Sequence, residues 1–534
     1  MKHRMNYDLG EVEKTKRKQN EAQKPETNRN GGLSNLRDSL SKNGVEEEET
    51  LDHISQLPDA LLVQILSLLP TNDAVASCVV SKRWRYLWTS IHNFLFIKSH
   101  SESQNFVSFV DHVLTHSTCS KIKKFHLDLD YTSYWNCELE ITRWISFAVE
   151  RKAEDVFLCS RGCDLTYILP LTMYADSSLI RLDLSHWVFD KGQVIAWNSL
   201  KSLKLDWIEL DDDDIVNLLS GCPALETLKL SVFHGFHLLE ITSLNLKRLT
   251  LAGYLKPCDG NEELLEIIAP HIQHLDISGD LGHLKCRLVN VSSLVTASLP
   301  FEITCITESR DEDEDADEED MCRDYHQVFE NLVLDYLQKL SHVTQLTIGS
   351  WFAKVVFMLE ENEHEEVPLP ELRCKCLTLE MHVTEYNLYG VASLLRASPL
   401  LETLNIHLGV KLTDFHCELE LSYFDEVDNI SLRSWISDIV FPNLKNVKIV
   451  GCTEKCLKEF WCEGGDKLFK LSKFLIKNAV ALKKFVIIGK RRKCWKCKES
   501  CFSRYLSGIA KKLLDIPRSS KNVVITYEEY ALHD

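Results

Sequence analysis

The sequence predicts a mixed α/β protein in which a small helical module precedes a solenoid of stacked strand-and-helix units. Proline-bounded apolar segments at helical spacing occur between residues 57 and 88. Segments of the form Leu-x-x-Leu-x-Leu then recur through most of the remaining chain. With 534 residues, of which 45% are hydrophobic, the chain is long enough for a large core and more than one domain.

Residues 1–50 are rich in Lys, Glu, Asn, Gln and Ser and have few apolar side chains. Such a segment cannot bury enough apolar surface to fold, so we predict a disordered tail. The basic run at 14–18 could be a nuclear-import patch, although similar runs are common in solvated tails.

The helical module begins at Pro58, and Asp59 is the predicted N-cap of its first helix. This helix carries an apolar stripe made of Leu61, Leu62, Ile65, Leu66 and Leu69. Pro70 cannot continue the helix. Caps for a second helix are offered by Thr71, Asn72 and Asp73. A third short element, 82–88, brings two tryptophans.

A unit of about 40 residues is at the lower limit for a stable core. Its surplus of apolar surface suggests that a partner completes it, although an ordinary helical hairpin inside a larger core would show the same periodicity. The order Leu57-Pro58, helix, Leu69-Pro70, helix and Ser-Lys-Arg-Trp-Arg-x-Leu-Trp at 81–88 resembles an F-box of the plant form. The resemblance places this domain at 51–97.

F-box modules dock onto the small Skp adaptor of a cullin-based ubiquitin ligase, so the resemblance implies an apolar surface that faces or supports that contact. We assign to this surface Leu57, Pro58, Leu61, Ile65, Leu66, Leu69, Pro70, Val79, Trp84, Leu87 and Trp88.

The repeated segments lie at 179–187, 200–207, 225–233, 246–254, 272–279, 343–350, 401–408 and 444–451, with poorer copies at 125–127, 156–158 and 485–487. From Leu182 to Ala297 they are spaced by about 21 to 26 residues, which is typical of leucine-rich repeats. We therefore predict a solenoid over 105–451, with parallel strands on its concave face and helices or turns outside. A doubly wound α/β domain is the alternative, but its glycine-rich phosphate turns are absent from the sequence.

Region 372–530 resembles a diverged FBD-type region of plant F-box/leucine-rich-repeat proteins. The resemblance rests on segments 444–452, 470–489 and 513–527, while the Val-Pro-x-Cys-Leu signature of the family is missing. Helix 470–481 and strand 482–488 would form the last, capping unit of the solenoid.

Three acidic runs are predicted to lie in solvent or at a helix start. Run 308–320, within an insertion at 308–322, and run 360–366 are predicted loops. Calcium binding at the first run would need the Gly and terminal Glu of an EF-hand, which it lacks. Four aspartates at 211–214 are predicted to begin a helix, where negative charge is favourable.

The formal net charge of −18 argues against general binding to nucleic acid or to anionic membranes. No apolar run is long enough to span a bilayer. Nineteen cysteines follow a polar N-terminal segment, so we expect reduced thiols in the nucleus and/or cytoplasm.

Catalytic, phosphate-binding and metalloprotease motifs are absent from the sequence, so we expect a non-catalytic protein without a cofactor. Cys494, Cys497 and Cys501 have spacing that could hold zinc, but a fourth ligand is needed. Cys452, Cys456 or Cys462 could supply it only if the fold brought them close, and a loop of reduced thiols is the alternative. The basic segment 490–521 could bind nucleic acid, but an acidic partner, an import signal or plain solvation is favoured.

The resemblance implies a substrate-recognition subunit that binds a Skp-family adaptor and, through it, cullin, and that holds an unknown protein target on its repeats. A Skp-binding scaffold outside any ligase and a metal- or ligand-regulated interaction protein are the alternatives.

Overall fold

A computed structural model describes residues 54, 56–98, 103–130, 137–161, 167–254, 264–282, 284–303, 318–361, 368–382, 387–409, 440–451, 467–491, 493–494 and 500–531. The predicted tail and its basic run, residues 308–317 of the acidic insertion, Cys497, and the cysteines at 452, 456 and 462 lie outside these ranges.

The helical module consists of α1 (Asp59–Leu66), α2 (Thr71–Ala76), η1 (Ser77–Val79) and η2 (Trp84–Ser90). The predicted side-chain caps are wrong, because Pro58 and Pro70 occupy the two N-cap positions in extended conformations. Asp59 is instead the first residue of α1 and pairs with the guanidinium of Arg83, with 2.6 Å between Oδ1 and Nη2.

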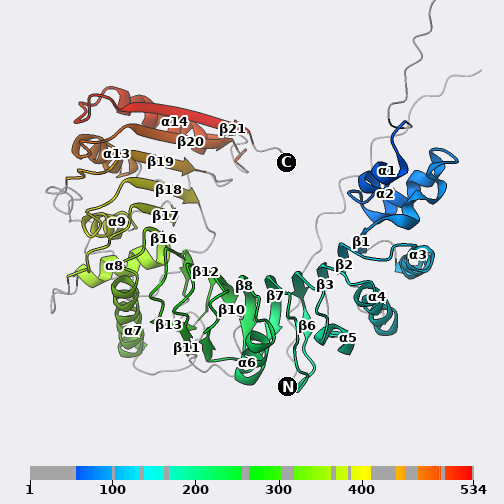
Figure 1. The fold of residues 1–534 in the computed structure, drawn as a ribbon. Helices are drawn as coiled ribbons and strands as arrows, with labels where there is room; N and C mark the ends of the chain where they lie inside the picture. The colour runs from blue at the N-terminus through cyan, green and yellow to red at the C-terminus, as the bar shows by residue number, and fades with distance from the viewer. Residues whose placement is uncertain are drawn as a thin grey trace, which may run out of the picture. The chain divides into compact units, whose positions relative to one another are not determined.

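The main sheet has sixteen strands among the described residues, and all of its pairs are parallel. They follow one another in chain order (Figure 1), with β15 beside β12. The strands are β1 (Asn93–Lys98), β2 (Lys124–Asp130), β3 (Asp155–Arg161), β5 (Arg181–Ser185), β7 (Ser202–Glu209), β8 (Thr227–His234), β10 (Arg248–Tyr254), β12 (His274–Asp280), β14 (Thr296–Leu299), β15 (Phe301–Glu302), β16 (Gln345–Gly349), β17 (Cys376–His382), β18 (Thr403–Gly409), β19 (Asn446–Gly451), β20 (Lys484–Arg491) and β21 (Val524–Ala531). The predicted solenoid of parallel strands is confirmed.

Two smaller parallel sheets accompany the first half of the main sheet. One has the order β13-β11-β9 and the other joins β4 to β6. Their strands are β4 (Tyr167–Ile168), β6 (Trp187–Val188), β9 (Leu238–Glu240), β11 (Leu264–Ile268) and β13 (Lys285–Asn290).

The helices between the strands are α3 (Ser103–His116), α4 (Glu138–Glu150), α5 (Leu171–Tyr174), α6 (Asp212–Gly221), α7 (Glu318–Lys339), α8 (Ser350–Glu361), α9 (Asn387–Arg396), α13 (Lys467–Asn478) and α14 (Cys501–Leu514). The prediction for 211–214 is confirmed: Asp211 caps α6 and forms a capping box with Asp214. Each of the two acidic runs predicted to be a loop, 308–320 and 360–366, is helical at one end. Helix α7 begins inside the acidic insertion, because its later turns bury apolar side chains such as Val333, and α8 runs into the second acidic run.

Alternate residues of each strand lie on opposite faces of the main sheet. Leu203 and Leu205 of β7 are fully buried, whereas Lys204 between them lies on the other face, which we call the open face. The helix-covered face leaves little room. A Cβ atom at Gly451 of β19 would lie 2.2 Å from Cε1 of Phe502 in α14.

Five successive repeats share a left-handed backbone residue at one register. His186, Trp207 and Val232 have φ of 63°, 54° and 48°, and the next two repeats place Gly253 and Gly279 there. The left-handed region favours glycine and costs other residues about 1–3 kcal/mol, so the first three repeats keep side chains there against the backbone preference.

The final unit of the solenoid differs from the prediction. The predicted helix 470–481 and strand 482–488 correspond to α13 and β20, but α14 and β21 follow and end the sheet. Region 372–530 therefore continues the same sheet through β17–β21. In the part of the chain that is described, no helix combines the length and apolarity needed to cross a membrane.

Candidate functional site

The helical module exposes large apolar side chains on α1 and around η1. We call Leu61, Ile65, Leu68, Leu69, Val79 and Val80 the exposed apolar set. On the adjoining side of α1, Leu62 and Leu66 are fully buried and form the module core. Because several exposed large apolar side chains on one small module commonly mark an interaction site, this set is the first candidate functional surface.

The residues assigned to this surface from the sequence fall into three groups. Leu61, Ile65, Leu69, Val79 and the two prolines, Pro58 and Pro70, are exposed. Leu57 and Leu87 are half-buried. Leu66, Trp84 and Trp88 are buried, so they support the module from inside and cannot present their side chains to a partner. Sequence reasoning missed Leu68, Val80 and Tyr86, which are all exposed, because helical periodicity alone does not show which face the rest of the chain covers.

The module is fastened to the first repeat through hydroxyl groups. The buried Thr71 hydroxyl accepts a hydrogen bond of 2.7 Å from the backbone N–H of Leu95 in β1, and the Ser67 hydroxyl accepts one from the N–H of His92. Trp88 also stacks on His112 of α3, with ring centroids 6.0 Å apart. These contacts hold the module while the exposed apolar set remains accessible.

The open face of the sheet carries rows of polar side chains that continue from strand to strand. Lys204 donates to Asp183 at 3.1 Å, and Arg161 donates to Asp128 at 2.7 Å. Burial raises the pKa of the Asp183 carboxyl, and the bond from Lys204 opposes that shift. At these early strands the open face therefore offers charged and hydrogen-bonding groups.

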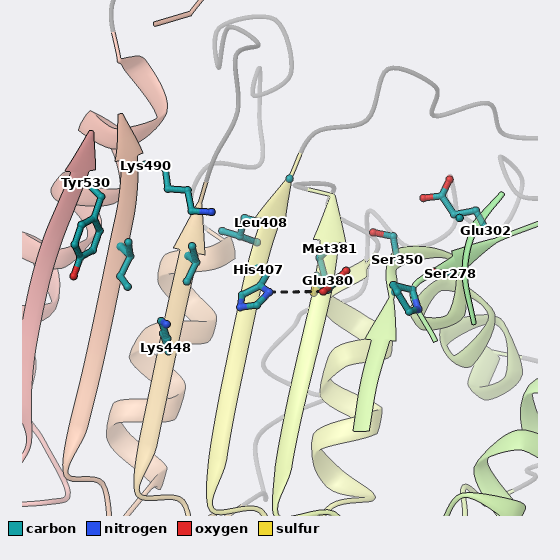
Figure 2. A pocket seen from close by; sticks show the side chains of 16 residues that line it. Ser278, Glu302, Ser350, Glu380, Met381, His407, Leu408, Lys448, Lys490 and Tyr530 are labelled. Carbon is teal, nitrogen blue, oxygen red and sulfur yellow. Dashed lines mark ion pairs between the residues drawn. The ribbon is translucent and has the colours of Figure 1, made fainter. Parts of the chain in front are cut away.

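A pocket of about 920 Å³ lies at the carboxyl ends of the later strands. Its lining reaches from Ser278 of β12 to Tyr530 of β21, and Figure 2 shows the side chains following one another across the strands. Met381, Leu408 and Ile488 contribute buried apolar surface. Sequence analysis assigned no residue of this pocket to a site.

The pocket holds charges of both signs. The Oε1 atom of Glu380 lies 3.8 Å from the Nδ1 atom of His407 (Figure 2). Interaction with His407 lowers the pKa of the Glu380 carboxyl, against the opposing effect of partial burial, so this carboxyl is ionised at neutral pH. Lys448 and Lys490 are exposed and have no ion-pair partner among the described residues.

The buried thiols are poor nucleophiles. Burial raises the pKa of Cys222 and of Cys286 to about 12, and burial together with Glu140 raises that of Cys137 to about 11. A thiol must lose its proton to attack or to bind a metal, so these cysteines have the character of core residues.

For the predicted zinc ligands, the structure places Cys494 in a buried position after β20 and Cys501 at the start of α14. Cys497 lies outside the described residues. Within the described ranges, no group of three or more His, Cys, Asp and Glu side chains is arranged to hold a metal ion.

Comparison with known proteins identifies two domains. The F-box domain matches residues 54–96, and a leucine-rich-repeat family described as At1g61320/AtMIF1, LRR domain, matches residues 113–307. The F-box match includes most of β1, so the first strand of the main sheet falls within the segment assigned to the helical module.

Several curated Arabidopsis thaliana proteins are similar over most of the chain. F-box/LRR-repeat protein At5g02910 is 32% identical over 73% of this chain and 80% of its own length. F-box/LRR-repeat protein At3g03360 is 30% identical over 67% and 71%. A protein described as an FBD-associated F-box protein, At5g22720, is 28% identical over 82% and 88%.

Proposed function

The chain belongs to the F-box/LRR-repeat protein family, and from this premise we propose that it is the substrate-recognition subunit of a Skp–cullin–F-box ubiquitin ligase. Its F-box binds a Skp-family adaptor and its repeats bind a target protein. The chain contributes position rather than catalysis: it brings the target to a ubiquitin-charged enzyme held by the other subunits. Such proximity makes transfer effectively intramolecular.

The observation that carries this proposal is the exposed apolar set. A module that faced only its own repeats would have covered these side chains, as it covers Leu62 and Leu66. Instead, hydrogen bonds at Ser67 and Thr71 fasten the module to the first strand while Leu68 and Val79 stay in solvent. Adaptor docking would bury them and complete a core that is small for an independent unit.

The test is a co-purification of the full chain, tagged at its C-terminus, with recombinant Skp-family adaptor and cullin. Recovery of both supports a ligase subunit, and auto-ubiquitination in a reconstituted reaction would extend that support. Recovery of the adaptor without cullin would favour a scaffold outside any ligase. Failure to recover the adaptor would reject the proposal.

A further inference from the structure

We propose that the pocket at the carboxyl ends of β12–β21 binds an extended segment of the target protein that carries a basic and an acidic side chain about three or four positions apart. This inference rests on the proposed function, since it specifies the chemistry of the target that the repeats hold. Its basis is the length of the pocket, the placement of its charges and the apolar side chains close to the lysines.

The pocket is too long for a compact small molecule. Its lining runs from β12 to β21, which is seven steps along the main sheet. At about 4.8 Å per step, the lining extends over roughly 34 Å, the length of about ten residues of extended chain. A volume of about 920 Å³ distributed over this length forms a trough rather than a compact cavity. A polypeptide segment lying across the strands matches that shape.

The charges are separated along the trough. Glu380 lies on β17, whereas Lys448 and Lys490 lie on β19 and β20 (Figure 2). All three side chains lie on the open face. Glu380, His407, Val450 and Ile488 pair with one another in turn across β17–β20 and so share that face. Lys448 lies two residues before Val450 and Lys490 two residues after Ile488, so alternation places both lysines on the same face. Two or three steps of the sheet correspond to about 10 to 14 Å, or about three or four residues of extended chain.

The lysines are available to an anionic group. On the neighbouring strand β21, the two carboxylates opposite residues 488 and 489 accept hydrogen bonds from other groups. Tyr530 donates to Glu528 at 2.7 Å, and Ser503 of α14 donates to Glu529 at 2.6 Å. On β17, the ion-pair partner of Glu380 among the described residues is His407, at 3.8 Å. An acidic side chain of the target therefore belongs beside the lysines and a basic one beside Glu380.

Two apolar side chains lie on the open face close to the lysines. Across the sheet from Glu380, His407 is followed at the same register by Val450, which is half-buried, and by Ile488, which is largely buried. The segment that fits is thus a basic residue and an acidic residue flanking at least one apolar side chain. Opposite charges two or three strands apart also disfavour segments of a single sign.

The experiment selects binders for the full-length chain from a displayed library of random twelve-residue peptides. We expect the selected peptides to be enriched in basic and acidic residues three or four positions apart with an apolar residue between them. A representative selected peptide is then synthesised and titrated against variants. Lys448→Glu with Lys490→Glu should weaken its binding at least tenfold, and Glu380→Lys should do the same.

The control is Lys484→Glu, which makes one substitution of the same kind at the other end of β20, outside the pocket lining, and should leave binding within twofold. Peptides without the paired charges, an absence of any selected peptide, or an equal loss in the Lys484 variant would each overturn the inference. Adaptor recovery is measured on the same samples. Loss of adaptor binding counts against the proposed function, whereas failure of peptide selection with adaptor binding intact counts against the trough alone.

Discussion

Truncating the two most exposed members of the apolar set should weaken adaptor binding without unfolding the chain. Val79 is 85% exposed and Leu68 is 82% exposed. Changing both to alanine removes about five methylene-sized groups at about 0.8 kcal/mol each when buried. Scaled by those exposed fractions, the loss is about 3 kcal/mol if docking covers both side chains, which corresponds to affinity about 200-fold weaker.

The assay is a calorimetric titration of the full chain with a purified Skp-family adaptor. Because both side chains lie in solvent in the free chain, their removal should shift the free energy of unfolding by no more than about 0.5 kcal/mol each. A denaturant titration of the same preparations establishes this point.

The matched control removes equally exposed apolar groups elsewhere. Leu139, at 83% exposure on α4, and Val194, at 76%, can be changed to alanine together. This pair should leave adaptor affinity unchanged. By contrast, Leu66→Ala empties a fully buried position and should cost about 2–5 kcal/mol of stability, so it cannot serve to map the interface. If Leu68→Ala with Val79→Ala binds the adaptor within threefold of the original chain, the exposed apolar set is not the docking surface.

Three further predictions concern the solenoid. Gly390→Ala would place a Cβ atom 1.8 Å from a backbone oxygen of α8 and should lower the free energy of unfolding by about 1–3 kcal/mol. Gly508→Ala, in open space on α14, should instead raise it by about 0.5–1 kcal/mol. Denaturant midpoints of the two variants that move in the same direction would contradict this. Burial raises the pKa of Asp276, so its ionised form opposes folding at neutral pH. Asp276→Asn should therefore stabilise the chain at pH 7, and the gain should shrink as the pH falls through the raised pKa towards 3.8; a gain that does not vary with pH would count against this cause. Cys222 and Cys286, whose pKa values burial raises to about 12, should resist iodoacetamide at pH 8 until denaturant is added, as peptide mass spectrometry can show, and rapid labelling of the native chain would be inconsistent with their burial.

The repeats were recognisable because their signal is local. In β18, alternation of Leu404, Asn405 and Ile406 directly specifies one buried face and one open face. Strand β17, in whose repeat the first leucine of the Leu-x-x-Leu-x-Leu pattern is replaced, was not predicted. Strand β17 follows the same spacing, but the buried Cys374 stands where the other repeats have their first leucine. A small buried thiol packs like an apolar side chain, so the fold tolerates an exchange that conceals the motif.

The sequence predicted that α1 is a helix but not the residue at which it begins. Asp59 follows a proline and is a common capping residue, yet the fixed geometry of Pro58 already supplies the extended residue before α1. Asp59 is thus one position inside the helix and pairs with Arg83, which lies 24 residues later in the chain. Such a pair depends on how η2 packs beside α1, and no local pattern contains that information.

By itself, the sequence determined that a short proline-bounded helical module precedes a parallel leucine-rich solenoid, because leucine spacing and proline positions act within a few residues. Only the tertiary structure decided that Ile65 faces solvent while its neighbour Leu66 is buried, since this depends on what packs against α1. The same holds for the trough. Glu380 and Lys490 lie 110 positions apart in the chain, and they share one surface only because the successive repeats pair in parallel and in register.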